Sequence, residues 1–193
     1  MSGNDQASGR VLIRVMPGEC RVGSGNQVFS TLLGSCIAAC LREPEHGVGG
    51  MNHFLLPSGD ASGNAAVGAA EQPLRYGLQA MDALIEGIRR ETSRRAALEA
   101  KVFGGARMIS ASTEVGFANA RFVLEYLQQL GIDVVAHDLG GHQPRVVEYT
   151  PRTGRARIRR IEMPMRRDPA EVAYVNAVDD KIRKIGEQAG DRS

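Results

Sequence analysis

The sequence predicts an α/β fold, in which a mixed β-sheet carries helices on its outside. Short apolar segments rich in β-branched residues alternate along the chain with two longer segments whose apolar residues recur at helical spacing. One pair of short segments is joined by a compact polar turn, which indicates an antiparallel hairpin and therefore a sheet that is not purely parallel. With 193 residues, the chain suits one domain that can bury a substantial core.

The composition excludes several classes of protein. Hydrophobic residues make up 42% and charged residues 24%, as in soluble globular proteins, and the net charge of +2 gives no strong general attraction to nucleic acid or membrane. Three cysteines, an odd number, argue against a disulfide framework and favour a reducing compartment. The N-terminus lacks the apolar core of a signal peptide, and no apolar run approaches the ~20 residues of a membrane span. We therefore expect a cytoplasmic protein without direct membrane insertion.

The first elements are a tail, a strand and a hairpin. Residues 1–9 are polar and rich in Ser and Gly, which predicts a disordered tail, and residues 10–16 carry the β-branched pattern of a strand. A hairpin is predicted for residues 28–57, where the apolar runs 32–41 and 48–56 flank a polar break that contains a turn-forming proline and glycine.

The hairpin would bring a cysteine and a histidine together. If Glu43–His46 form the turn, the antiparallel register places Cys36 opposite His53, with Cβ atoms roughly 4.5 to 5.5 Å apart. An imidazole at that distance can activate a thiol as a nucleophile, and the preceding Gly34-Ser35 would let a substrate approach. Either Thr31 or Ser30 could orient the imidazole. The alternative is that the cysteine and the histidine have only structural roles. The prediction also depends on the register, since a slip of one residue would send His53 to the opposite face.

The middle of the chain is predicted to contain a loop, a helix and a short strand. Residues 57–72, rich in Ser, Gly and Ala, are either a substrate-facing flap or a slack solvent loop. A helix is expected over 73–91 and a strand over 100–103. The strand ends at Gly104-Gly105, which would permit close approach of a neighbouring backbone. The phosphate-loop pattern G-x-x-x-x-G-K-[ST] is absent there, so nucleotide binding is rejected.

The next segments are a helix, a strand and a glycine-rich turn. The helix is expected over 113–130, with Gly131 as its stop, and the strand over 132–136. The two histidines and the aspartate of His137–His142 could suggest a metal site. They lack a third ligand at a recognised spacing, so we favour a turn and expect neither a metal nor a cofactor.

The last part of the chain is rich in arginine. Residues 144–149 and 155–161 read as a hairpin, and seven arginines lie between Arg152 and Arg167. The favoured interpretation is a solvated strand face, and the alternative is an electrostatic landing surface for an acidic partner. Nucleic acid is disfavoured because aromatic residues for base stacking are missing. Residues 163–193 are expected to form a helical C-terminal extension that docks on the domain or recruits a partner.

Four motifs resemble those of the chemoreceptor glutamine deamidases, the CheD family. They are TLLGSCIAACL at 31–41, GGMNHFLLP at 49–57, KVFGGARMI at 101–109 and DLGGHQPRVVEYTPRTGRARI at 138–158. The resemblance covers residues 10–162, which would form the deamidase domain. It implies mixed layered sheets, sandwich-like, with helices packed outside, similar to the catalytic domains of glutamine-deamidating toxins.

The resemblance also implies an activity. Members of the family are protein-glutamine glutaminases, amide hydrolases with a cysteine nucleophile that convert glutamines on the cytoplasmic helices of methyl-accepting chemoreceptors to glutamate during chemotaxis adaptation. A Cys, a His and an upstream Thr carry this chemistry, which here would be Cys36, His53 and Thr31, with Ser30 left open as the third residue. The family further suggests receptor methylesterase activity and docking with a CheC-type phosphatase.

Two other functions remain as alternatives. A non-catalytic chemotaxis adaptor would bind receptors and a CheC-type phosphatase without turnover. A cysteine peptidase or a transglutaminase-like acyl transferase is disfavoured, because those families place the histidine far from the cysteine, whereas here 17 residues separate Cys36 and His53.

Overall fold

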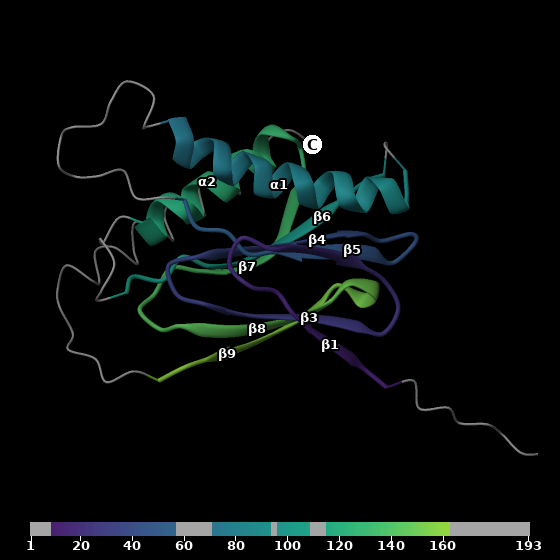
Figure 1. Ribbon diagram of the computed structural model, residues 1–193, viewed down its shortest axis with the longest axis horizontal. Helices are drawn as coiled ribbons and strands as arrows, with labels where there is room; N and C mark the ends of the chain where they lie inside the picture. Colours follow the sequence, from purple (N-terminus) through teal and green to yellow (C-terminus); the bar gives the residue numbers. More distant parts are fainter. Residues whose placement is uncertain (1–8, 57–70, 94–95, 109–114, 163–193) are drawn as a thin grey trace, which may run out of the picture.

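The computed structural model describes residues 9–56, 71–93, 96–108 and 115–162, which form two stacked sheets with two helices on one side (Figure 1). The strands are β1 (Val11–Arg14), β2 (Cys20–Gly23), β3 (Gln27–Leu33), β4 (Ile37–Glu43), β5 (Val48–Asn52), β6 (Glu99–Gly104), β7 (Asp133–Leu139), β8 (Arg145–Thr150) and β9 (Arg155–Arg160). The helices are α1 (Glu71–Glu91), α2 (Val115–Gln129) and the short 3₁₀ turn η1 (Pro151–Thr153). The predicted tail, except Gly9, and the predicted C-terminal extension lie outside the described residues, as does most of the predicted flap.

Both sheets are mixed. The four-stranded sheet has the order β1-β3-β8-β9, and the five-stranded sheet has the order β2-β5-β4-β6-β7. The pairs β1–β3 and β6–β7 are parallel, while the other neighbours are antiparallel. The predicted α/β class with layered sheets and outer helices is therefore confirmed.

The five-stranded sheet is buried on both faces, and β4 explains how. Ile37, Ala39 and Leu41 belong to a core shared with the helices, whereas Ala38 and Cys40 belong to a second core between the two sheets. Side chains alternate along a strand, so each residue from Ile37 to Leu41 must be small or apolar to fit one core or the other. This requirement accounts for the unbroken apolar run in the sequence.

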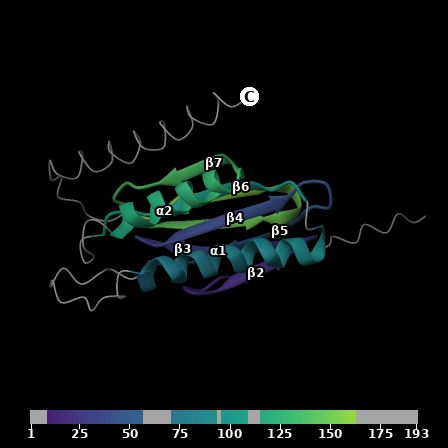
Figure 2. The same cartoon turned by 90° about the horizontal axis from the view of Figure 1, so that it is seen from above.

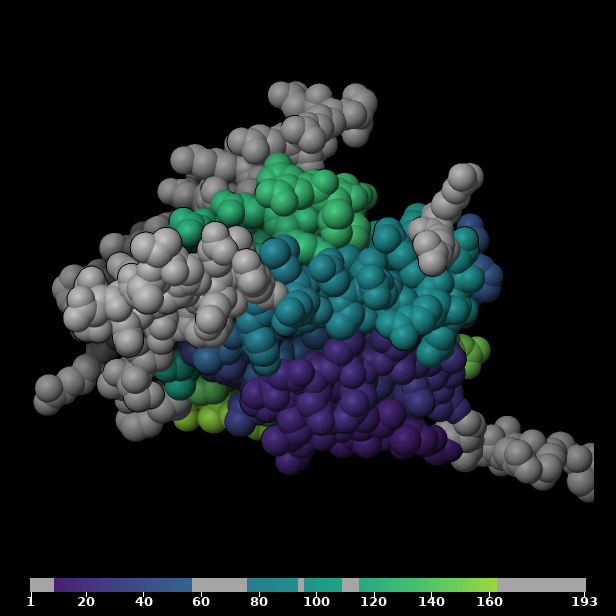
Figure 3. Space-filling view, turned by 45° about the horizontal axis from the view of Figure 1, so that its top comes forward, coloured from purple at the N-terminus to yellow at the C-terminus, as the bar shows by residue number. Residues whose placement is uncertain are grey.

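The two predicted helices are present and lie side by side over the five-stranded sheet (Figures 2 and 3). Tyr126 of α2 donates a hydrogen bond to the Asp82 carboxylate of α1, which joins them directly. The described part of α2 ends as expected at Gly131, which has a positive φ of 65° and lets Ile132 donate its N–H back to Leu127. No helix in the described ranges is long and apolar enough to cross a membrane.

The predicted apolar strand 32–41 does not exist as one strand. The chain runs in the four-stranded sheet up to Leu33, crosses at Gly34–Cys36 and joins the five-stranded sheet at Ile37. Leu33 before the crossing and Ile37 after it are both fully buried, and only the short pair Gly34-Ser35 marks the change of sheet in the sequence. Cys36 therefore lies on the crossover and not within a strand.

The β4–β5 hairpin is confirmed, but its predicted register is wrong. The loop is Pro44–Gly47, so Glu43 pairs with Val48. Gly47 takes a positive φ of 64° at the last loop position, and the Glu43 carboxylate accepts the backbone N–H groups of Glu45 and His46 at 3.0 and 2.7 Å. Fixing the loop this way shifts the pairing by two residues, which leaves every side chain on its predicted face.

Two other predicted segments compare differently with the structure. The arginine-rich hairpin is confirmed as β8 and β9 joined through η1. The strand that follows α2 is longer than predicted, because β7 continues to Leu139 and includes His137 and Asp138. The turn itself is Gly140-Gly141, and both glycines have positive φ values, of 73° and 72°.

Candidate active site

Residues from both sheets meet at one end of the core between them. Thr31 lies near the end of β3 in the four-stranded sheet, and His53 directly follows β5 in the five-stranded sheet. Thr31 and His53 are buried, with 4% and 3% of their surfaces exposed, while Cys36 is partly exposed on the crossover. The three side chains named by the sequence therefore come from β3, from the crossover that follows it and from the residue after β5.

The imidazole of His53 is held by a short hydrogen-bond chain. Its Nδ1 lies 2.8 Å from Thr31 Oγ1, and the Thr31 hydroxyl donates to the backbone oxygen of Val15 at 2.7 Å. A hydroxyl has one proton, so Thr31 must accept a hydrogen bond from the Nδ1–H of His53. Nε2 then carries the lone pair, and it is buried without a hydrogen-bond partner among the described residues. The ring is thus fixed in the tautomer that leaves Nε2 free to accept a proton.

The structure distinguishes Thr31 from Ser30, which the sequence left open. Side chains alternate along β3, and Phe29 and Leu33 face the core between the sheets together with Thr31. Ser30 consequently faces the other side of the four-stranded sheet. Only Thr31 of the two can reach the imidazole.

Cys36 and His53 lie on the same face but not directly opposite each other. The last pairing between their segments is the bridge of Ile37 with Phe54, closed by two backbone hydrogen bonds of 2.9 Å. His53 is then opposite Ala38, and Cys36 is its diagonal neighbour. Such diagonal positions are roughly 7 to 8 Å apart, and side chains can lean across that distance. Cys36 also packs against the core between the sheets, the side on which His53 hydrogen-bonds to Thr31.

The crossover that carries Cys36 is held by the glycines at the end of β6. The N–H of Gly105 donates to the oxygen of Cys36, and the N–H of Ala106 donates to that of Gly34, both at 2.8 Å. A Cβ on Gly104 would lie 2.0 Å from the Cys36 oxygen, so no other residue fits without displacing the backbone. The predicted close approach at Gly104-Gly105 is confirmed.

Asn119 of α2 also holds the crossover, and the sequence reading missed it. It is fully buried, donates its amide to the oxygen of Ser35 at 2.8 Å and accepts the N–H of Leu56 at 2.8 Å. This one side chain therefore connects the segment before Cys36 to the segment after His53. A lone amide next to the apolar stripe of a helix was the available signal, because a buried polar side chain needs a fixed partner.

Burial shifts the pKa values of both candidate reactive groups toward their neutral forms. Burial raises the pKa of Cys36 above its ordinary value of 9.0, against a smaller effect of its backbone N–H. Burial lowers the pKa of His53 below 6.5, against a smaller effect of the Val15 backbone. At neutral pH the pair is therefore a thiol beside a neutral imidazole, and the proton would move only when the thiol attacks.

The other two thiols differ from Cys36. Cys40 is fully buried in the core between the sheets, which strongly raises its pKa. Burial raises the pKa of Cys20 to about 11, against a smaller effect of Arg21. Cys40 is sealed inside the core, and Cys20 packs against the other core, on the helix side of the five-stranded sheet, whereas Cys36 is partly exposed and packs on the side of His53. Cys36 is therefore the candidate nucleophile of the described part of the chain.

The aspartate of the segment 137–142 is bound by arginines. The Asp138 carboxylate is held by Arg145 and, at 2.8 Å, by Arg160. Within the described ranges, the group of side chains close enough to share a metal ion is Glu43, Glu45 and His46. There the Glu43 carboxylate already accepts the His46 Nδ1 at 2.9 Å as part of the hairpin turn.

Comparisons with known proteins agree on one family. The family model described as CheD chemotactic sensory transduction matches residues 55–160, which begin two positions after His53. The relatives below all carry the name probable chemoreceptor glutamine deamidase CheD. That of Bordetella petrii is 46% identical over 77% of this chain, and the match spans 66% of the relative, just under two thirds. The relative from Rhizobium etli is 49% identical, and the match covers 75% of this chain and 77% of the relative. The relative from Hydrogenovibrio crunogenus is 39% identical, and the match covers 92% of this chain and 93% of the relative. The chain therefore belongs to the CheD family.

Proposed function

We propose that this protein is a chemoreceptor glutamine deamidase, which hydrolyses the side-chain amide of receptor glutamines to give glutamate and ammonia. The names of the relatives support this activity. The observation that carries the mechanism is the unpaired Nε2 of His53, on a ring oriented by Thr31 and on the same face as Cys36. A thiol nucleophile needs a general base of this kind within reach of its sulfur.

The reaction proceeds through a thioester. Cys36 Sγ attacks the carboxamide carbon while His53 Nε2 accepts the thiol proton, and the carbonyl electrons move to oxygen. Backbone N–H groups of the Gly34–Cys36 crossover, which carries the attacking sulfur, would stabilise this oxyanion. The imidazolium then gives its proton to the departing nitrogen, which leaves as ammonia. Water, deprotonated by Nε2, cleaves the thioester and returns the proton to sulfur, so glutamate is released and the enzyme is restored.

The test is to incubate the protein with a receptor cytoplasmic fragment and map Gln-to-Glu conversion peptide by peptide with mass spectrometry. Cys36→Ala should abolish the conversion and leave the folded structure intact, because the thiol is only partly buried. Cys20→Ala is the matched control, since it removes another half-buried thiol and should leave the conversion unchanged. Full conversion by Cys36→Ala, or cleavage or cross-linking of the fragment, would refute the proposed reaction.

A non-catalytic adaptor is the second candidate function. The observation that favours it is the raised pKa of Cys36, which makes the thiol a poor nucleophile unless His53 takes its proton. An adaptor would bind the receptor fragment with equal affinity before and after replacement of Cys36 and would never produce glutamate. The same assay, run beside a binding measurement, separates the two functions.

Several wider proposals rest on the same family membership. Residues 10–162 would form the deamidase domain and residues 163–193 an extension, with a layered fold related to that of glutamine-deamidating toxins. The substrates would be cytoplasmic helices of methyl-accepting chemoreceptors, and the protein would then act in the cytoplasm. The thioester route also accommodates a receptor glutamate methyl ester, since only the leaving group differs. A CheC-type phosphatase would be its regulatory partner, testable by co-purification of the two proteins.

A further inference from the structure

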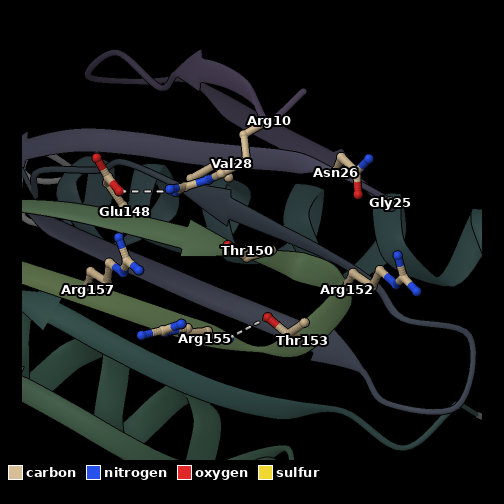
Figure 4. Close-up of a pocket in the computed structure, with 10 residues that line it drawn as sticks. All are labelled: Arg10, Gly25, Asn26, Val28, Glu148, Thr150, Arg152, Thr153, Arg155 and Arg157. Atoms are coloured by element: carbon tan, nitrogen blue, oxygen red, sulfur yellow. Dashed lines mark hydrogen bonds and ion pairs between the residues drawn. The ribbon is translucent and has the colours of Figure 1, made fainter. Parts of the chain in front are cut away.

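A basic cleft of about 370 Å³ lies on the four-stranded sheet (Figure 4). Its floor includes Val28 of β3, and the arginines around it are Arg10, Arg152, Arg155 and Arg157. Val28 belongs to the face of β3 opposite Phe29, which packs between the sheets, so the cleft opens away from the five-stranded sheet. We refer to it as the arginine cleft.

The positive charge of the arginine cleft is mostly uncompensated. Glu148 is the one acidic residue that lines it, and its carboxylate accepts Arg10 at 3.3 Å (Figure 4). No ion pair between described residues includes the guanidinium groups of Arg152, Arg155 or Arg157. All three of these side chains are exposed. The cleft therefore offers at least three free guanidinium groups to a ligand.

Protection of a sheet edge explains only part of this arrangement. Arg155 and Arg157 lie on β9, an edge strand, where charged side chains discourage pairing with other chains. Arg10 precedes β1 at the opposite edge, and Arg152 belongs to η1. Arginines from three separate segments line the same hollow, and Arg10 extends over Val28 toward Glu148 in Figure 4.

We propose that the arginine cleft binds an acidic protein segment through several of its Asp or Glu side chains. Arginine forms paired hydrogen bonds with carboxylates, which favours such a ligand. Arg155 and Arg157 lie on one side of β9, about 7 Å apart at ~3.3 Å per residue, a spacing suited to separate carboxylates more than to one compact anion. The residues lining the cleft include no aromatic side chain, so single-stranded nucleic acid would find nothing to stack on.

The occupant would leave the candidate active site open. Val28 lies near the start of β3, whereas the crossover with Cys36 follows the end of this strand, roughly 20 Å away at ~3.3 Å per residue. The cleft also opens on the outer face of the sheet, while His53 and Thr31 lie between the sheets. The arginine cleft is therefore a separate docking surface, and its test does not depend on turnover.

The test measures fluorescence anisotropy of a labelled hexaglutamate peptide titrated with the full chain at low and high salt. Wild type should bind it saturably and more weakly as salt rises. Arg155→Gln with Arg157→Gln should lower the affinity about tenfold, because two charge-assisted contacts are lost. The control is Arg89→Gln with Arg121→Gln, which removes the same charge from exposed positions on α1 and α2 and should change the affinity less than about twofold.

Three results would overturn the proposal. The first is the absence of saturable binding by wild type, and the second is an equal loss of affinity in the two double variants, which would indicate a general charge effect. The third is a preference for another anion. It would be seen as tighter binding of a labelled oligothymidylate than of the peptide, or as displacement of the peptide by inorganic phosphate added at the same concentration of negative charge. Circular dichroism of each variant checks that the fold is kept.

Discussion

At the scale of single residues, the candidate site depends on which atom holds each proton. Thr31 donates its only hydroxyl proton to Val15, so it can hold His53 in just one tautomer. Burial keeps the His53 ring neutral and the Cys36 thiol protonated. In the proposed reaction the hydroxyl would act through the imidazole without touching the substrate, so Thr31 would be a positioning residue.

Replacing Thr31 by Val should lower the rate of receptor deamidation by about 10- to 100-fold, the size of effect known for groups that orient metal-bound histidines. The shape is retained, but Nδ1–H loses its acceptor and the ring can adopt the other tautomer. Thr31→Ser should restore most of the rate, because it returns the hydroxyl. Ser30→Ala, next to it on the opposite face, is the control and should behave as wild type. Equal rates for Thr31→Val and wild type would remove Thr31 from the mechanism.

The pH dependence of the reaction should reflect the lowered pKa of His53. Only the neutral imidazole can take the thiol proton, so kcat/KM should remain high through pH 6.5 and fall at a lower pH as His53 is protonated. A midpoint of the acidic limb at or above 6.5 would contradict the buried, neutral ring.

The free energy of unfolding should also depend on the protonation of His53. A histidine whose pKa is lower in the folded state binds fewer protons there than in the unfolded chain, so the free energy of unfolding falls as the pH drops from 6.5 through the folded-state pKa. Urea unfolding at several pH values measures this slope. His53→Gln, which has no titrating ring, should make the slope shallower over that window.

At the scale of elements, the crossover is the part of the fold that the site needs most. It joins β3 of one sheet to β4 of the other, and its backbone oxygens are held by the end of β6 and by Asn119 of α2. Cys36 is thus fixed by residues that are more than 60 positions away in the sequence. The contact that leaves least room is Gly104 against the Cys36 oxygen.

Gly104→Ala should destabilise the protein by more than about 2 kcal/mol, because its methyl group would overlap the Cys36 oxygen at a φ of 111°. It should also slow deamidation well below the unfolding temperature, since the crossover must move. Gly131→Ala is the matched control: it also has a positive φ, of 65°, but open space around it, and should cost only about 1 kcal/mol. Thermal unfolding and the receptor assay on both variants give the comparison. Similar costs at the two positions would mean that the close approach is unimportant.

The sequence predicted those features of the site that depend on local pattern. The alternation of side chains along the hairpin correctly placed Cys36 and His53 on one face, although the predicted register was wrong by two residues. A shift of two residues leaves each side chain on the same face of the sheet. The split between β3 and β4 was missed, since Leu33 and Ile37 on its two sides are both buried apolar residues and only Gly34-Ser35 marks it. The contacts of Val15 and Asn119 depend on how distant elements dock, and a single sequence holds no record of that.

At the scale of the whole molecule, the two sheets share a core that ends at the candidate site. Leu33, the last residue of β3, is fully buried in this core just before the crossover. Its neighbour Leu32 is 56% exposed on the outer face of the four-stranded sheet. Replacing each leucine in turn therefore shows how much of the stability comes from packing between the sheets, because only Leu33 contributes to that packing.

Leu33→Ala should lower the free energy of unfolding by about 2 to 5 kcal/mol, because it leaves a cavity between the sheets. Leu32→Ala should change it by no more than about 0.5 kcal/mol, since its side chain is already largely in water. Urea unfolding of both variants, followed by circular dichroism, provides the measurement. Comparable losses in the two would argue that the sheets do not pack as described.

The hydrogen bond between Thr31 and His53 joins two sheets that share no strand pairing among the residues that the structure describes. Each sheet can keep its own ladder while the gap between them widens, yet a bond of 2.8 Å cannot survive even a small separation. Catalytic activity would then report how closely the two sheets pack. Heat, pressure or a bound partner that separates the sheets should abolish activity while the secondary structure is still intact.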